Sequence, residues 1–220
     1  VVCEQTLVSP CIHGEAHLHE EETSMSQTSS PPTTITLKRS VVTSIEVLIV
    51  SPEQQAGVVE HMRRMVPDVL PHQSGLVSAS VHRSWDGTHV VNYLQWANAA
   101  SYEKMQNNAM LEQERSRLLP LVRSVHQDLY DVVYTDDHTP DGITTITQEY
   151  DGDTFINVMN TSPEQQQALV TFVTGNDAQV FAVAPGYRSA NFHRSHDGTK
   201  VINYSHWDNQ QAFLDAINSM

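Results

Sequence analysis

The sequence predicts an α+β protein of ferredoxin-like type in which one unit occurs twice. The first observation is a repeat: residues 82–96 read His-Arg-Ser-Trp-Asp-Gly-Thr-His-Val-Val-Asn-Tyr-Leu-Gln-Trp, and residues 193–207 follow the same pattern. The second is that this 111-residue offset holds without a gap from Thr33 to the chain end. The third is the order of patterns in each unit: strand, helix, strand, strand, helix, strand. A period this long indicates a duplicated domain rather than a solenoid.

We divide the chain into a tail or linker over 1–32, a first unit over 33–140 and a second over 141–220. The tail does not have the composition of a packed domain, because it ends in a stretch rich in Ser, Thr and Pro. Its His13, His17 and His19 are interpreted as part of a solvated tail rather than as metal ligands, since their neighbours are Glu rather than Cys.

Each element of the first unit follows from a local pattern. Residues 40–50 are β-branched and apolar, which predicts a buried strand. Ser51 and Pro52 suit the N-cap and first turn of a helix, with Gln54 in a capping-box position. Asp86-Gly87 predicts a hairpin turn. The remaining elements are expected as strands over 76–84 and 88–96, helical stretches over 98–108 and 112–119, and a last strand over 122–134.

The second unit copies this order but lacks one element. We expect strands over 154–160, 187–195 and 199–207, a helix after Ser162-Pro163 and a helix over 209–219. By the offset, the final strand would begin near position 233, beyond the end of this sequence. Our first explanation for the missing strand is a truncated chain. The second is an added strand from the strand-like residues 1–8, and a partner chain is a further source.

The hairpin register decides which side chains share a face. A two-residue turn pairs Ser84 with His89 and puts His82 and Asn92 on opposite faces. A three-residue loop pairs Ser84 with Thr88 and puts them on the same face. We favour the second, because an x-Asp-Gly loop suits a type I turn followed by a glycine bulge. It predicts that two sets of side chains converge: His82, Asn92 and Trp96 in the first unit, and His193, Asn203 and Trp207 in the second.

These residues are interpreted as a functional site rather than as ordinary packing. Asn is a weak strand former, and a buried Asn needs partners for its amide. The set appears in both units, although most helix residues differ between them.

The pattern His-x-x-x-Asp-Gly-Thr-x-Val-Val-Asn-Tyr-x-Gln-Trp, with Tyr102 six positions after the Trp, resembles the antibiotic biosynthesis monooxygenase superfamily. It is most similar to the cofactor-independent enzymes that oxidise polycyclic anthrones to quinones in aromatic polyketide pathways. The resemblance implies a dimeric α+β barrel, here built within one chain, with a pocket between sheet and helices in each unit. It also implies a small aromatic substrate and molecular oxygen as partners, and no flavin, haem or metal.

The resemblance also implies roles for particular residues. Asn92 and Trp96 would hydrogen-bond the substrate or its oxygen adduct, and His82 and Tyr102 would help to hold or protonate it. An arginine after the second helix is expected to contribute, and Arg115 or Arg117 could supply it. The second unit keeps His193, Asn203 and Trp207 but has Phe213 in place of Tyr102 and lacks the arginine region, so the first unit is expected to be the better-equipped site.

Three alternatives remain open at the level of sequence. One is a haem-binding or haem-degrading relative with His82 or His193 as the iron ligand. Another is a non-oxidative cyclase or isomerase that uses the same pocket. The third is a non-catalytic small-molecule binding module.

Composition narrows the partners and the compartment. The net charge of −14 disfavours nucleic acid and anionic membranes, and the sequence contains no apolar run of about 18 residues. Cys3 and Cys11 are the only cysteines; we expect free thiols in a reducing cytosol rather than a disulfide. No signal peptide is visible, so a cytoplasmic protein is predicted. We expect an intramolecular pseudo-dimer and leave a further homodimer open.

Overall fold

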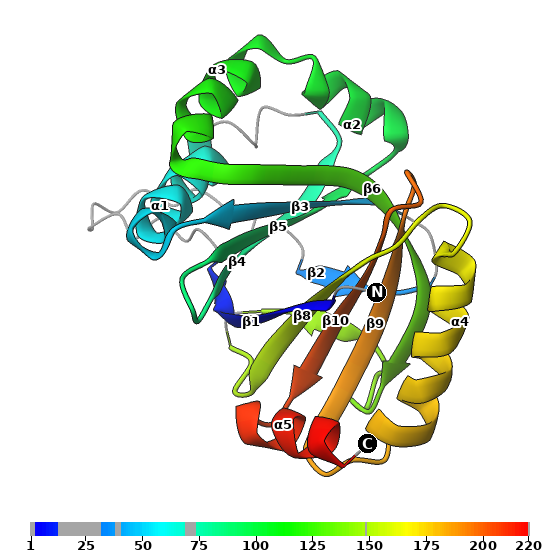
Figure 1. Cartoon of the computed structure of the whole chain (residues 1–220). Coiled ribbons are helices and arrows are strands. Elements are labelled where there is room, and N and C mark those ends of the chain that lie inside the picture. The colour runs from blue at the N-terminus through cyan, green and yellow to red at the C-terminus, as the bar shows by residue number, and fades with distance from the viewer. Residues whose placement is uncertain (1–2, 13–31, 38–40, 69–73, 148, 220) are drawn as a thin grey trace, which may run out of the picture.

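Eight strands close into one barrel, with helices on its outer surface (Figure 1). The computed structural model describes residues 3–12, 32–37, 41–68, 74–147 and 149–219. The strand order around the barrel is β1-β4-β5-β3-β6-β9-β10-β8. The α+β fold and the tandem ferredoxin-like units are confirmed, and the two units form an intramolecular pseudo-dimer.

The helices and strands that the sequence predicts are present, with shifts at their ends, and the short strands β2 and β7 are added to them. In the first unit they are β2 Thr33–Ile35, β3 Val42–Val50, α1 Pro52–Asp68, β4 Leu76–Ser84, β5 His89–Trp96, α2 Ala99–Gln106, α3 Ala109–Leu118, a 3-10 turn Leu119–Leu121 and β6 Val122–Asp137. In the second they are β7 Thr144–Ile146, β8 Asp153–Asn160, α4 Gln166–Asn176, a π-helical turn Asp177–Phe181, β9 Tyr187–Ser195, β10 Lys200–Trp207 and α5 Gln210–Asn218.

Strand β6 belongs to both units, which explains why it runs beyond the predicted end at residue 134. Its first half pairs with β3, from Val122 to Tyr130. Its second half pairs with β9, from Tyr130 to Asp137. One long strand therefore joins the two sheets at one side of the barrel.

Strand β1, Cys3–Ile12, joins the two sheets at the other side. Its first part pairs with β8, and its second part pairs with β4. It thus occupies the place expected for a final strand of the second unit. Of the sources that the sequence left open for this strand, the structure shows our second choice, a strand from the N-terminal tail, in this position. Closure is favourable because it pairs backbone groups that would otherwise form open sheet edges. The histidines of the tail, His13, His17 and His19, lie outside the described residues.

A second sheet was not anticipated from the sequence. The repeated Thr-Thr-Ile segments, β2 and β7, pair with each other in antiparallel register. Their Ile35 and Ile146 are buried in the same apolar cluster as the side chains inside the barrel. This short ladder therefore contributes to the barrel core and ties the start of one unit to the start of the other.

The hairpin register differs from the one we favoured. His82 pairs with Val91, so Ser84 and His89, rather than Ser84 and Thr88, bracket the loop. The Ser84 hydroxyl oxygen accepts from the backbone N–H groups of both Thr88 and His89, at 3.0 and 2.8 Å. The Asp86 carboxylate also accepts from the Thr88 N–H. These bonds hold Thr88 in the loop, and the one-residue difference turns the His82 side chain to the other face.

The same hairpin is fastened to helix α1 by a side chain that sequence reasoning passed over. Gln55 donates from its amide nitrogen to the backbone carbonyls of Ser84 and His89, at 2.8 and 3.0 Å. Gln166 makes the equivalent bonds to Ser195 and Lys200 in the second unit. The repeated Ser-Pro-Glu-Gln-Gln segment therefore starts a helix and also fixes the hairpin loop beneath it.

Candidate active site

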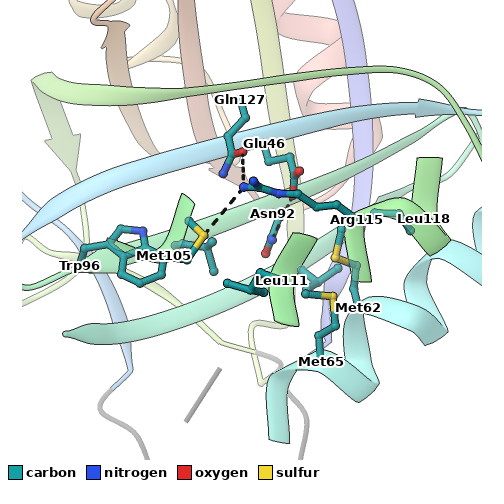
Figure 2. Close-up of a pocket in the computed structure, with 12 residues that line it drawn as sticks. Glu46, Met62, Met65, Asn92, Trp96, Met105, Leu111, Arg115, Leu118 and Gln127 are labelled. Carbon is teal, nitrogen blue, oxygen red and sulfur yellow. Dashed lines mark hydrogen bonds between the residues drawn. The ribbon is translucent and has the colours of Figure 1, made fainter. Parts of the chain in front are cut away.

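A cavity of about 50 Å³ lies between the outer face of the first-unit sheet and helices α1, α2 and α3 (Figure 2). Most of its wall is apolar, and three of the wall residues are methionines. Four polar side chains interrupt this apolar wall. The apolar residues are Met62, Met65, Val81, Leu94, Trp96, Met105, Leu111 and Leu118, and the polar ones are Glu46, Asn92, Arg115 and Gln127.

Asn92 and Glu46 face each other across neighbouring strands. They are paired in the β3–β5 ladder, and the Asn92 amide nitrogen donates to a Glu46 carboxylate oxygen at 3.4 Å. Burial raises the pKa of Glu46, while the hydrogen bond from Asn92 and the charge of Arg115 act in the opposite direction. Sequence reasoning identified Asn92 but missed Glu46. The available signal was an acidic residue in the middle of an otherwise apolar strand, Ile-Glu-Val-Leu-Ile-Val.

Arg115 is the arginine that reaches this cavity. It extends from α3, and its guanidinium donates to the side-chain oxygens of Gln106 and Gln127, at 2.5 and 3.2 Å. Figure 2 shows the bond to Gln127. Arg117, the other candidate, makes an ion pair with Glu114, and its side chain is mostly exposed. The two glutamines therefore hold a positive charge at the cavity wall, and of the two candidate arginines Arg115 is the one that lines the cavity.

Trp96 is fully buried and forms one wall of the cavity. Its indole N–H donates to the Ser44 hydroxyl at 3.0 Å, so this donor is already engaged. Tyr102 packs edge-on against the indole with ring centroids 6.2 Å apart, and burial raises the pKa of its hydroxyl. Trp96 thus gives the cavity an apolar surface, and the ring of Tyr102 packs against the Trp96 indole.

The predicted convergence of His82 with Asn92 and Trp96 is wrong, and so is that of His193 with Asn203 and Trp207. Both histidines point into the barrel interior and are fully buried. His82 packs edge-on against Tyr204 at 5.5 Å. The Nε2 atom of His193 lies 3.0 Å from the hydroxyl of Tyr93. Tyr93 is the first-unit residue that corresponds to Tyr204. The cause is the one-residue difference in hairpin register. Because of it, neither histidine lines the cavity, and neither could bind an iron ion there.

In the second unit, aromatic rings fill the corresponding face of the sheet. Phe155 stacks on Phe213 with centroids 3.8 Å apart, and Trp207 meets Phe213 at 5.5 Å. Asn203 is partly buried, and its side-chain oxygen has no hydrogen-bond partner. By the repeat offset, Phe155 replaces Ser44 and Asn157 replaces Glu46. The second unit therefore lacks the polar side chains that Ser44 and Glu46 supply in the first.

The structure as described contains neither a metal-binding cluster nor a membrane-spanning helix. Among the described residues, no group of three or more His, Cys, Asp or Glu side chains is placed to hold a metal ion. No helix within the same ranges is long and apolar enough to span a bilayer.

Fold and site together define a tandem α+β barrel with a mostly apolar cavity beneath the helices of its first unit. Residues 41–113 and 154–219 match the family described as antibiotic biosynthesis monooxygenase. Tetracenomycin-F1 monooxygenase of Streptomyces glaucescens is 35% identical over 79 residues, which are 36% of this chain and 70% of that relative. The chain belongs to the antibiotic biosynthesis monooxygenase family, and the predicted oxidoreductase class, monooxygenase, is confirmed.

Solved structures show the same architecture. An anthrone oxidase-like protein superposes with a TM-score of 0.75 and 22% sequence identity, over 83% of this chain and 79% of that chain. A monooxygenase-like protein from Fusobacterium nucleatum superposes with a TM-score of 0.51 and 11% identity, over 81% of each chain. At these identities the likeness establishes the fold.

Proposed function

We propose that the first-unit cavity is the active site of a cofactor-independent monooxygenase. Its substrate is a polycyclic, anthrone-type polyketide intermediate, and its oxidant is molecular oxygen. The observation that carries the proposal is the placement of two hydrogen-bond donors, the Asn92 amide and the Arg115 guanidinium, in the wall of an otherwise apolar cavity. The 35% identity to tetracenomycin-F1 monooxygenase supports the substrate class.

Oxidation of an anthrone by oxygen requires little more than an apolar cavity with hydrogen-bond donors in its wall. An anthrone has an acidic C–H group next to its aromatic rings, and the anion formed by its loss is a good electron donor to oxygen. The developing negative charge resides on the substrate carbonyl oxygen, where Asn92 and Arg115 can donate hydrogen bonds. Trp96 provides a flat apolar surface for the ring system. Each preorganised donor at such an oxyanion is worth about 3–4 kcal/mol of barrier.

The cavity must enlarge to admit such a substrate. Its volume is about 50 Å³, whereas pockets for drug-sized ligands measure roughly 300–1,000 Å³. Met62, Met65 and Met105 lie between the cavity and the helices, and methionine side chains change conformation more easily than branched or aromatic ones. We expect the substrate to displace these three side chains and to move α2 and α3 outward.

The test is an aerobic incubation with a polycyclic anthrone, without added flavin or metal, followed by quinone absorbance and oxygen consumption. Asn92→Ala is expected to lower kcat about 10²- to 10³-fold, the effect of losing one oxyanion donor. Asn203→Ala, the same change in the second unit, is the matched control and is expected to retain turnover. Circular dichroism and thermal melting establish that both variants are folded.

Other results would overturn the proposal. Equal turnover by wild type and Asn92→Ala would remove this cavity as the active site. Conversion of the substrate without oxygen uptake would identify a non-oxidative cyclase or isomerase. Binding of the anthrone without conversion would identify a binding module, and a Soret band in the purified protein would identify a haem protein.

A further inference from the structure

We propose that Glu46 is the catalytic base that takes the proton from the acidic C–H group of the substrate, and that the second unit lacks this step. The inference rests on the proposed function and adds to it the residue that starts the reaction.

Position supports this role. Glu46 extends from the middle of β3 into the cavity wall beside Asn92 (Figure 2). Among the residues that line the cavity, Glu46 has the only carboxyl group. Because the Asn92 amide and this carboxylate are 3.4 Å apart, a substrate carbonyl bound to Asn92 would bring the acidic carbon, across the central ring of an anthrone, within reach of Glu46.

The carboxylate is not tied up in a structural ion pair. Its hydrogen bond within the described residues comes from Asn92 and is long, 3.4 Å. The Arg115 guanidinium, which attracts it through space, instead donates to Gln106 and Gln127. A buried carboxylate with one long hydrogen bond is a stronger base than a solvated one, because burial raises its pKa.

The groups that face Glu46 come from every element around the cavity. Helix α3 contributes the cation Arg115, and helix α2 contributes Tyr102, whose hydroxyl is close enough to feel the charge of Glu46. The other neighbours are uncharged: Met62 and Met65 from α1, Asn92 from β5 and Gln127 from β6. The acid–base behaviour of the site is therefore set by Glu46 with Arg115 beside it.

The reaction balances with oxygen as the sole oxidant. The substrate C–H bond breaks, an O–H bond forms on Glu46, and the electron pair spreads to the carbonyl oxygen. The anion gives its electrons to oxygen, a C–O bond forms, and Glu46 returns the proton to the outer peroxide oxygen. Loss of the second proton from the same carbon to Glu46 cleaves the O–O bond. The products are a quinone and hydroxide, which leaves as water after taking that proton.

The second unit cannot perform the first step in this way. Asn157 occupies the position equivalent to Glu46 and pairs with Asn203 as Glu46 pairs with Asn92. An amide does not accept a proton at neutral pH. Of the two equivalent positions, only the one in the first unit therefore carries a base.

Proton transfer can be measured separately from oxidation. Wild-type protein, held with the anthrone in D₂O without oxygen, is expected to speed exchange of the substrate C–H protons. In Glu46→Gln this exchange and the aerobic kcat should both fall about 10²- to 10⁴-fold, the usual contribution of a general base. Fluorescence quenching by the quinone product should show retained binding. Glu103→Gln, a change at an exposed carboxylate on α2, is the matched control and should exchange at the wild-type rate.

A stability measurement separates a catalytic from a structural role. Burial raises the pKa of Glu46 in the folded protein above 4.5, its pKa in the unfolded chain. Glu46 therefore contributes stability below pH 4.5, and this contribution is lost as the pH rises through the pKa of the folded state. Glu46→Gln, which carries no charge, is therefore expected to melt at a higher temperature than wild type at pH 8. Its kcat/KM should also lose the acidic limb of the wild-type pH profile.

The outcomes distinguish the two proposals. An active wild type together with wild-type exchange in Glu46→Gln refutes the role of Glu46 and leaves the proposed function standing. A wild type that neither exchanges nor oxidises the anthrone refutes both. If Glu46→Gln does not fold, Glu46→Asp decides: the shorter carboxylate is expected to reduce exchange at least about tenfold, and an unchanged rate contradicts the assignment.

Discussion

His193 makes the stability of this protein depend on pH below neutrality. Its ring is fully buried inside the barrel. The Nδ1 atom lies 3.0 Å from the backbone oxygen of Asn191, which can only accept, so Nδ1 carries the proton. Nε2 therefore accepts from the Tyr93 hydroxyl, 3.0 Å away in the other unit. The structure thus specifies a neutral ring, and burial lowers the pKa of His193 to about 4.

The size of the effect follows from linkage. In the unfolded chain the pKa of His193 is 6.5, so the unfolded state binds more protons between pH 6.5 and about 4. The stabilising contribution is fully present above pH 6.5 and is lost as pH falls toward 4. At 1.36 kcal/mol per pH unit, the loss is about 3 kcal/mol by pH 4. His206, whose pKa burial also lowers to about 4, adds a similar loss in the same range.

Urea denaturation at several pH values between 7.5 and 4.5 measures this dependence. His193→Gln, which cannot titrate, should be less stable at neutral pH but should lose about 1 kcal/mol less per pH unit on acidification. Gln54→Asn, a change at an exposed side chain that does not titrate, is the control and should keep the wild-type slope. An unchanged slope in His193→Gln would show that this ring is not held neutral in the folded protein.

Three further predictions concern the barrel. Tyr93→Phe leaves His193 without its donor and should lower the free energy of unfolding by about 1–3 kcal/mol in urea titrations. Gly198→Ala should cost more than about 1 kcal/mol in the same assay, because Gly198 has φ +78° and an added Cβ would lie 2.9 Å from the backbone of Pro163. Deletion of residues 1–12 exposes the edges of β4 and β8, so it should lower the melting temperature and cause self-association in size-exclusion chromatography; a monomer with unchanged melting would contradict the closing role of β1.

Local pattern was sufficient for most elements and for part of the site. The hairpin, the helix starts and the strand order follow from residue types at fixed short spacings. Asn92 and Trp96, which line the cavity, were predicted because they belong to a recognisable pattern, whereas Arg115 was one of two candidates. Glu46 was not found, because an acidic residue in a strand has no meaning until its neighbours are known. Its significance depends on helices α1–α3 covering that face of the sheet.

The sequence by itself determined that this protein is a duplicated ferredoxin-like unit, and it identified the family. Those conclusions rest on periodicity and on residue identity, which require no knowledge of distant contacts. Tertiary structure alone decided that both histidines face the barrel interior, that β1 closes the barrel and that Glu46 shares a cavity with Asn92. The physical reason is that a one-residue change in strand register reverses every side chain, and that this register is set by loop hydrogen bonds and long-range pairing.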